Sequence, residues 1–233
     1  QPPDGRFHRI RVTSSLNTAR VHARKGYYAG RKLESDALTG ADLEGEDWQL
    51  LMDRANQALK AGDLKQFAAV LEKLVRRFPN RAPLWQALGA AQLNLGEPQQ
   101  AVAALQKAFA LSPEDKAIGL TLSRAFIAAG LGEAAAQTME MVAQRNPRDI
   151  GILMQLGRTY EAAGKTGEAH RTYRGALDVG FDPPPELYLV LTRTSVRLGR
   201  VIEARLFVDD FLARGGAPAD IDPWRQLIPN NAP

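Results

Sequence analysis

A period of 34 residues constrains this chain more than any other feature of its sequence. Gly62, Gly96, Gly130 and Gly164 are each 34 residues apart, and Gly199 follows 35 residues later. The same 34-residue spacing relates two further sets, Pro79, Pro113 and Pro147, and Ala101, Ala135 and Ala169. A fixed period of this length predicts a solenoid, in which each repeat is one supersecondary unit that stacks on the next.

Each repeat reads as two amphipathic helices separated by the recurring glycine. The first helices are expected at 48–61, 82–95, 116–129, 150–163 and 185–198. The second helices are expected at 64–78, 98–111, 132–145, 166–179 and 201–214. Glycine suits the end of the first helix, because it adopts a left-handed backbone without the steric cost of a Cβ atom. Proline follows three of the second helices, since it cannot continue a helical hydrogen-bond ladder.

Small residues recur where the two helices of a repeat must cross closely. They are Ala55, Gly89, Ser123, Gly157 and Thr192 in the first helices, and Ala101, Ala135, Ala169 and Ala204 in the second. One helix pair cannot bury its apolar face alone, so several pairs must stack. We therefore predict an all-α fold with five repeats, near 48–81, 82–115, 116–149, 150–184 and 185–215.

The most regular repeat is the second. It runs from Trp85, Leu88 and Gly89 through Gly96, Ala101, Leu105, Ala108 and Pro113. This pattern resembles the tetratricopeptide repeat (TPR) family, over about residues 48–215. The resemblance implies a right-handed α-solenoid that binds other proteins, as in repeat proteins of pilus assembly, secretion, cytochrome maturation and exopolysaccharide export.

The resemblance also implies an inner groove, lined by fixed places on the first helices. Carried onto this sequence, the groove residues are Met52, Asn56, Gln86, Leu93, Leu120, Arg124, Met154, Arg158, Leu189 and Arg193. Arg124, Arg158 and Arg193 hold equivalent places in three consecutive repeats, and we expect them to form a ladder beside an apolar stripe. Such a surface suits a peptide with apolar anchors and acidic groups. The alternative is a solvated face on which these arginines pair with Glu161 and Glu186.

Residues 1–47 lie outside the repeats and form a basic arm. Residues 1–33 contain eight Lys or Arg and one acid, whereas the other 200 residues contain 22 basic and 25 acidic residues. The alternation after Phe7 predicts a short extended stretch. The expected contact residues of the arm are Phe7, Arg9, Arg11, Arg20, Arg24, Tyr27, Tyr28 and Arg31. We expect the arm to dock on a partner protein or on its own solenoid. The alternatives are a solvated tail and binding to nucleic acid or another anionic polymer.

No pattern of catalytic or metal-binding residues emerges from the sequence. There is no cysteine, and the three histidines have no neighbours at metal-ligand spacing. His170 reads as a surface residue of a second helix. The lysine and asparagine set with which one TPR branch grips chaperone tails is matched only by Asn56, so we do not expect a chaperone clamp. We expect no enzyme, no cofactor and no metal site.

The resulting expectation is a protein-binding scaffold or assembly factor within a larger bacterial complex. No run of about 18 apolar residues predicts a membrane span. The chain begins with Gln1, which is in keeping with removal of a signal peptide and a periplasmic or secreted protein. The first alternative is binding of an anionic polymer, either exopolysaccharide or nucleic acid, through the arginine ladder and the arm. A cytoplasmic regulator or co-chaperone is the second alternative. Residues 216–233, with Trp224, Leu227 and Ile228, are expected to cap the end of the solenoid.

Overall fold

We analysed a computed structural model of the chain, which describes residues 7–9, 26–28, 40–179, 182–225 and 227–228. The chain divides into two parts, Gln1–Leu50 and Leu51–Pro233. In the first part, the strands β1 (Phe7–Arg9) and β2 (Gly26–Tyr28) pair antiparallel, with Phe7 opposite Tyr28 and Arg9 opposite Gly26. The strand β1 lies within the stretch for which an extended backbone was predicted.

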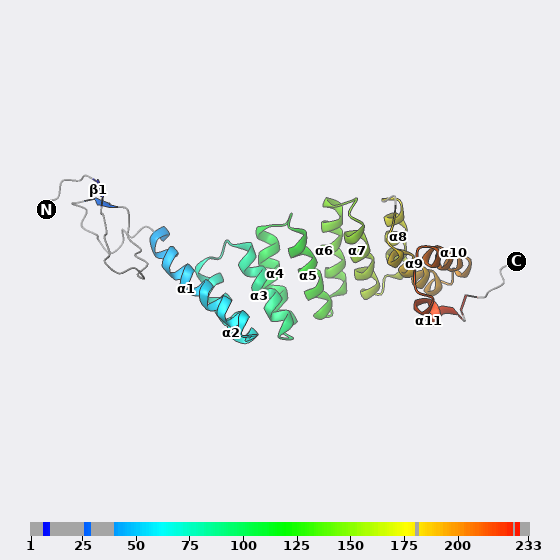
Figure 1. The fold of residues 1–233 in the computed structure, drawn as a ribbon, viewed down its shortest axis with the longest axis horizontal. Coiled ribbons are helices and arrows are strands. Elements are labelled where there is room, and N and C mark those ends of the chain that lie inside the picture. The colour runs from blue at the N-terminus through cyan, green and yellow to red at the C-terminus, as the bar shows by residue number, and fades with distance from the viewer. Residues whose placement is uncertain (1–6, 10–25, 29–39, 180–181, 226, 229–233) are drawn as a thin grey trace. The chain divides into compact units, whose positions relative to one another are not determined.

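The second part is a right-handed α-solenoid of helix pairs, as predicted from the period (Figure 1). The first helices are α1 (Gly40–Lys60), α3 (Ala82–Asn94), α5 (Lys116–Ala128), α7 (Ile150–Ala162) and α9 (Pro185–Arg197). The second helices are α2 (Leu64–Arg77), α4 (Pro98–Leu111), α6 (Gly132–Arg145), α8 (Thr166–Leu177) and α10 (Val201–Ala213). Except at α1, the observed ends agree with the predicted ends to within two residues.

The helix α1 begins at Gly40, eight residues before the expected start. Its first two turns contain the acids Asp42, Glu44, Glu46 and Asp47. Negative side chains near a helix N-terminus interact favourably with the exposed N–H groups there. The helix therefore includes these acids, which lie before its expected start at residue 48, and Gly45 is tolerated within it at a cost of about 1 kcal/mol relative to alanine.

The recurring glycines adopt the left-handed backbone that their place in the repeat requires. The φ angle is +71° at Gly62, +76° at Gly96, +75° at Gly130 and Gly164, and +72° at Gly199. After Gly96 the N–H of Glu97 donates to the carbonyl of Gln92 at 2.9 Å, which closes the end of α3. The period of the sequence is thus a period of helix endings.

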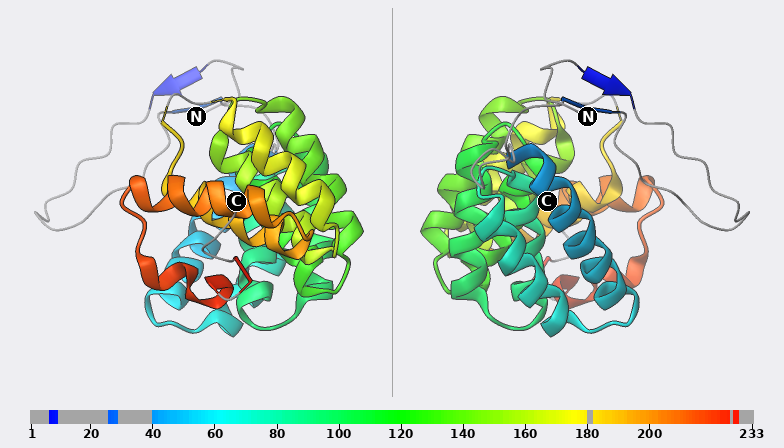
Figure 2. Two further views of the ribbon diagram at one scale, coloured as in Figure 1. Left: turned by 90° about the vertical axis from the view of Figure 1, so that its right-hand side faces the viewer. Right: turned by 90° about the vertical axis from the view of Figure 1, so that its left-hand side faces the viewer.

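Close crossing of the two helices in a repeat depends on the small residues. A Cβ atom at Gly89 would overlap the side chain of Leu105, and one at Gly157 would overlap the ring of Tyr173. In the second helices Ala101, Ala135, Ala169 and Ala204 are all completely buried. Each helix of the described solenoid packs mainly on its neighbours in sequence, so the core runs along the stack between the pairs. The two end-on views in Figure 2 show that α9 and α10 (orange) run in a different direction from the green helices.

Short helices follow the last repeat, η1 (Pro218–Ile221) and α11 (Asp222–Arg225). Ile221 and Ile228 are 7% and 6% exposed and belong to the same apolar cluster as Phe207 and Phe211 of α10. Trp224 packs against this cluster and is half-buried. These apolar side chains shield the end of the core from water.

The loop that breaks the 34-residue period is tied to the end of α10. Arg214 donates from Nη1 to Oδ1 of Asp182 at 2.5 Å, and its guanidinium carbon lies 4.9 Å from the centre of the Tyr188 ring. The hydrogen bond to Asp182 raises the pKa of Arg214 above its already high usual value. Asp182 is in the loop before α9, so this cluster joins both ends of the last helix pair.

Candidate partner-binding groove

The first helices of the second, third and fourth repeats lie closer to one another than the second helices do. Besides contacts between consecutive helices, α3 contacts α5 and α5 contacts α7, with no comparable contact between second helices among the described residues. In a curved stack, elements on the inner side approach most closely. The first helices therefore line the inner surface, and we call the surface formed by the ten predicted residues on α1, α3, α5, α7 and α9 the groove.

The ten groove residues differ in how far they reach solvent. Asn56, Arg124 and Arg158 are exposed. Six side chains are half-buried, namely Met52, Gln86, Leu93, Leu120, Leu189 and Arg193. Met154 is only 8% exposed and belongs to the apolar core of the last two repeats. The apolar stripe that the groove offers to a ligand is thus carried by leucines rather than by Met154.

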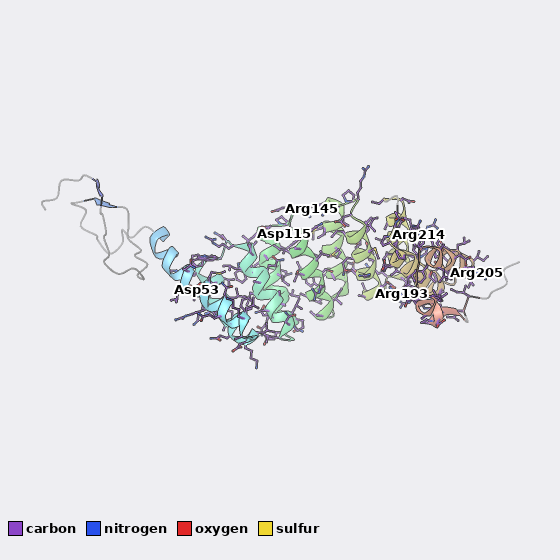
Figure 3. All side chains as sticks on the ribbon, viewed as in Figure 1. Asp53, Asp115, Arg145, Arg193, Arg205 and Arg214 are labelled. Atoms are coloured by element: carbon purple, nitrogen blue, oxygen red, sulfur yellow. The ribbon has the colours of Figure 1, made fainter. Side chains whose placement is uncertain are left out.

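The three ladder arginines have different surroundings. Arg193, which is labelled in Figure 3, donates from Nε and Nη2 to the two carboxylate oxygens of Glu161, at 3.1 and 2.6 Å. Arg124 and Arg158 have no ion pair or hydrogen bond within the part of the chain that the structure describes. The alternative of paired arginines therefore holds for Arg193 alone, and the other two guanidinium groups keep all their donors for solvent or a ligand.

Glu161 is held by three side chains from two other helices. Its carboxylate accepts from Tyr173 Oη at 2.8 Å and lies 3.5 Å from Nη1 of Arg197, in addition to its two bonds with Arg193. The carboxylate is only 9% exposed, so it is well shielded from water. Burial, together with the neighbouring Glu161 charge, raises the pKa of Tyr173 and keeps its hydroxyl protonated as a donor.

A small cavity adjoins Arg124 between the second and third repeats. It has a volume of about 380 Å³ and is lined by Leu93 and Asn94 of α3 and by Arg124, Ile127 and Ala128 of α5. The lining combines apolar carbon with one guanidinium group. This combination can accept an apolar side chain whose neighbour carries a negative charge.

The expectation that His170 is a surface residue is wrong. His170 is 1% exposed, its Nδ1 lies 3.0 Å from Oγ1 of Thr194 on α9, and its Nε2 lies 3.3 Å from Glu203 of α10. Glu203 also pairs with Arg174 and Arg200, at 2.8 and 3.5 Å. The fourth and fifth repeats therefore meet through a polar cluster that is buried at His170 and reaches solvent at Arg174 and Arg200. We call this cluster the His170 joint.

The sequence contained a signal for this cluster. Counted from the repeat glycine, His170 occupies the place held by Ala68, Val102 and Ala136 in the first three repeats, and all three are buried. A polar residue at a place that is apolar and buried in the three preceding repeats predicts a buried polar contact. Burial lowers the pKa of the His170 imidazole, and the nearby carboxylate of Glu203 only partly offsets this effect.

Four of the eight predicted arm residues lie in the two paired strands. Phe7 and Arg9 belong to β1, and Tyr27 and Tyr28 belong to β2. Arg11, Arg20, Arg24 and Arg31 lie outside the described residues.

The described residues contain no group of three or more His, Cys, Asp or Glu side chains placed to hold a metal ion. In the same part of the chain, no helix combines the length and the hydropathy needed to cross a membrane.

A sequence model of the cytochrome c-type biogenesis protein H TPR domain matches residues 47–179. The chain belongs to this family. In this member of the cytochrome c-type biogenesis protein H TPR family, the matched span contains Arg124, Arg158 and the cavity beside Arg124. The fifth repeat, with Arg193, lies beyond it.

Solved structures with the same fold include the TPR proteins MamA and PilF. A MamA protein superposes with a TM-score of 0.63 at 19% identity, over 81% of this chain and 100% of that chain. PilF of Pseudomonas aeruginosa superposes with a TM-score of 0.56 at 20% identity, over 76% of this chain and 80% of that chain. At these identities the likeness shows the TPR fold alone. A sequence comparison with curated proteins found no match.

Proposed function

We propose that this chain is a non-catalytic scaffold that holds a partner protein in its groove as part of a bacterial assembly complex. The family and fold support a protein-binding scaffold in general terms. The observation that carries the proposal for this surface is the state of Arg124 and Arg158. Both are exposed on neighbouring inner helices and neither is neutralised by a described residue.

Apolar side chains beside these arginines support the same proposal. Leu93, Leu120 and Leu189 are half-buried, so each leaves part of its surface to water in the free protein. Covering such surface yields about 25 cal/mol per Å² of apolar area, whereas the arginines add charge-assisted hydrogen bonds. A surface with both properties fits a protein segment better than a purely charged polymer, which would leave the leucines exposed.

We further propose a role in the periplasm, with the basic arm as a second contact to the complex. The name of the family supports an assembly role, since it refers to the biogenesis of another protein. The high density of Lys and Arg in residues 1–33 favours an acidic or polyanionic surface as the contact of the arm.

Affinity capture with a charge-reversed groove tests the proposal. The full chain, the Arg158→Glu variant and the control Arg145→Glu would be used as baits in an extract of the native source, and captured proteins quantified by mass spectrometry. Arg145 is an exposed residue of the second helix α6, so the control makes the same charge change outside the groove. We expect a partner that is lost with Arg158→Glu and retained with Arg145→Glu.

Two outcomes would contradict the proposal. A captured set that is the same for all three baits would show that the groove binds none of the partners. Capture of nucleic acid or polysaccharide in place of protein, with a steep dependence on salt, would favour the anionic polymer instead.

A further inference from the structure

The spacing of the two free arginines constrains the segment that the groove can hold, given the proposed function. Arg124 and Arg158 occupy equivalent places on α5 and α7, one repeat apart, and these two helices contact each other directly. The axes of contacting helices are about 8–10 Å apart. The backbone positions from which the two arginine side chains extend are therefore also about 8–10 Å apart.

Among common backbone conformations, polyproline II matches this separation best. It rises about 3.1 Å per residue with three residues per turn, so residues i and i+3 lie on one face about 9 Å apart. In a β-strand, residues i and i+2 share a face but lie only about 6.4–6.8 Å apart, whereas residues i and i+3 point to opposite faces. An α-helix needs about six residues to advance the same distance.

The cavity beside Arg124 adds an apolar requirement. Its volume of about 380 Å³ accommodates a side chain such as leucine, and Leu93 and Ile127 provide apolar walls. Because Arg124 also lines this cavity, the apolar residue of the ligand must stand next to the acidic residue that Arg124 binds.

The ion pair between Arg193 and Glu161 limits the number of acidic residues that the groove can bind. Arg193 already donates two hydrogen bonds to Glu161, so the next step of the ladder presents a guanidinium whose charge is offset. A third acidic residue at i+6 would meet the field of the Glu161 carboxylate as well as that of Arg193. The ladder therefore offers two acid-binding places rather than three.

We infer that the groove binds a partner segment in polyproline II conformation whose two acidic residues stand three positions apart, with an apolar residue beside the one held by Arg124. Each acidic residue accepts hydrogen bonds from one guanidinium, and the apolar side chain fills the cavity between α3 and α5.

Synthetic peptides test the spacing directly. Fluorescein-labelled Ala-Pro-Leu-Glu-Pro-Pro-Glu-Pro-Ala places two glutamates three positions apart in a proline-rich, extended chain. Controls move the second glutamate one position nearer, replace both glutamates by glutamine, or replace leucine by serine. Fluorescence anisotropy with the full chain should show at least tenfold tighter binding of the first peptide than of each control. Equal affinity for the first peptide and the glutamine peptide would overturn the inference.

Variants of the protein assign each contact. Arg124→Gln and Arg158→Gln should each weaken binding of the first peptide at least fivefold, while Arg145→Gln should leave it unchanged. These arginines are exposed and make no hydrogen bond or ion pair with a described residue, so the variants should keep their helical circular dichroism spectrum. Loss of binding in Arg145→Gln as well would point to non-specific charge attraction and would count against the inference.

An unbiased selection separates this inference from the proposed function. Because the chain has no cysteine, Gln86→Cys can be labelled at one site with a bulky maleimide that obstructs the groove, with Gln144→Cys on α6 as the labelled control. Random peptides displayed on phage would be selected on the unlabelled protein. Groove-dependent peptides without an acidic pair would overturn the inference and leave the scaffold proposal standing. Peptides that bind equally after both labels would contradict both.

Discussion

Arg193 and Glu161 form a two-point ion pair across the joint between the fourth and fifth repeats, with its shorter contact at 2.6 Å between Nη2 and Oε2. The two residues come from first helices of adjacent repeats, α9 and α7. The pair thus fastens the last repeat to the one before it and also removes one arginine from the binding ladder. Stability and selectivity at this end of the groove depend on the same carboxylate.

Replacing Glu161 by glutamine should change stability and binding in opposite directions. The variant retains the shape of the side chain but removes the charge that Arg193, Arg197 and Tyr173 share. We expect a loss of roughly 1–3 kcal/mol in unfolding free energy, the range for hydrogen bonds to a charged group. A peptide with a third glutamate at i+6 should bind more tightly to the variant than to the parent. Chemical denaturation and anisotropy measure the two effects, and unchanged affinity for this longer peptide would show that Glu161 does not limit the ladder.

A methyl group at Gly157 should weaken the fourth repeat. The added Cβ atom would overlap the completely buried ring of Tyr173, which has no room to move. Overpacking of this kind costs about 1–3 kcal/mol. The matched control is Gly175→Ala on α8, where nothing lies within 4 Å of the new atom. This control should be neutral or stabilising by up to about 1 kcal/mol, because alanine favours helix over glycine. Equal unfolding midpoints for the two variants would contradict the packing that we describe.

Mild acid should destabilise the His170 joint. Burial lowers the pKa of His170 below its value in the unfolded chain, so the unfolded state binds more protons as the pH falls through about 6.5. Stability is therefore present at neutral pH and declines as the pH falls below about 6.5. Glu203 attracts the added proton, whereas Arg174 and Arg200 oppose it.

The measurement compares thermal unfolding at pH 7.5 and 5.5. The parent chain should lose more stability than His170→Gln, in which this titration is absent. A variant that lacks the other two histidines, His8→Gln with His22→Gln, should behave like the parent. If that double variant loses the pH dependence and His170→Gln retains it, the assignment to His170 is wrong.

Removing residues 1–39 should separate assembly from folding. The helix α1 starts at Gly40, so this truncation leaves all the helices of the solenoid complete. We expect nearly unchanged helical circular dichroism per molecule, together with loss of copurification with the complex. The control replaces the eight Lys and Arg residues of positions 1–33 by glutamine in the full chain. A truncated chain that still copurifies would contradict the proposed role of the arm.

The repeat architecture could be predicted because it depends on local rules. A glycine such as Gly130 ends the first helix of its repeat with a left-handed residue. A small residue such as Ala135 lets the two helices of a repeat cross closely. The glycine recurs in all five repeats and the alanine in the last four, so both requirements are visible as a period. The helix α1 was predicted too short, because its first eight residues lie outside the repeat and carry no periodic signal.

For the candidate site, only the positions of its residues could be predicted, and not the surroundings of each side chain. The resemblance put Arg124, Arg158 and Arg193 at equivalent positions, but the state of each arginine depends on which carboxylate reaches it. Glu161 pairs with Arg193, 32 residues away, and leaves Arg158 free, although Arg158 is only three residues away on the same helix. Side-chain reach between helices decides this choice, and no periodicity encodes it. The burial of His170 was missed for a related reason, since it depends on a contact with the following repeat.

Contacts confined to adjacent repeats have a consequence for how this chain tolerates change. A residue at one joint, such as His170, affects the repeats on either side and has little direct influence on α3 or α4. Sequence drift at one joint therefore needs no compensation elsewhere in the stack. The last repeat can therefore change its contacts with a partner during evolution while the other repeats keep theirs.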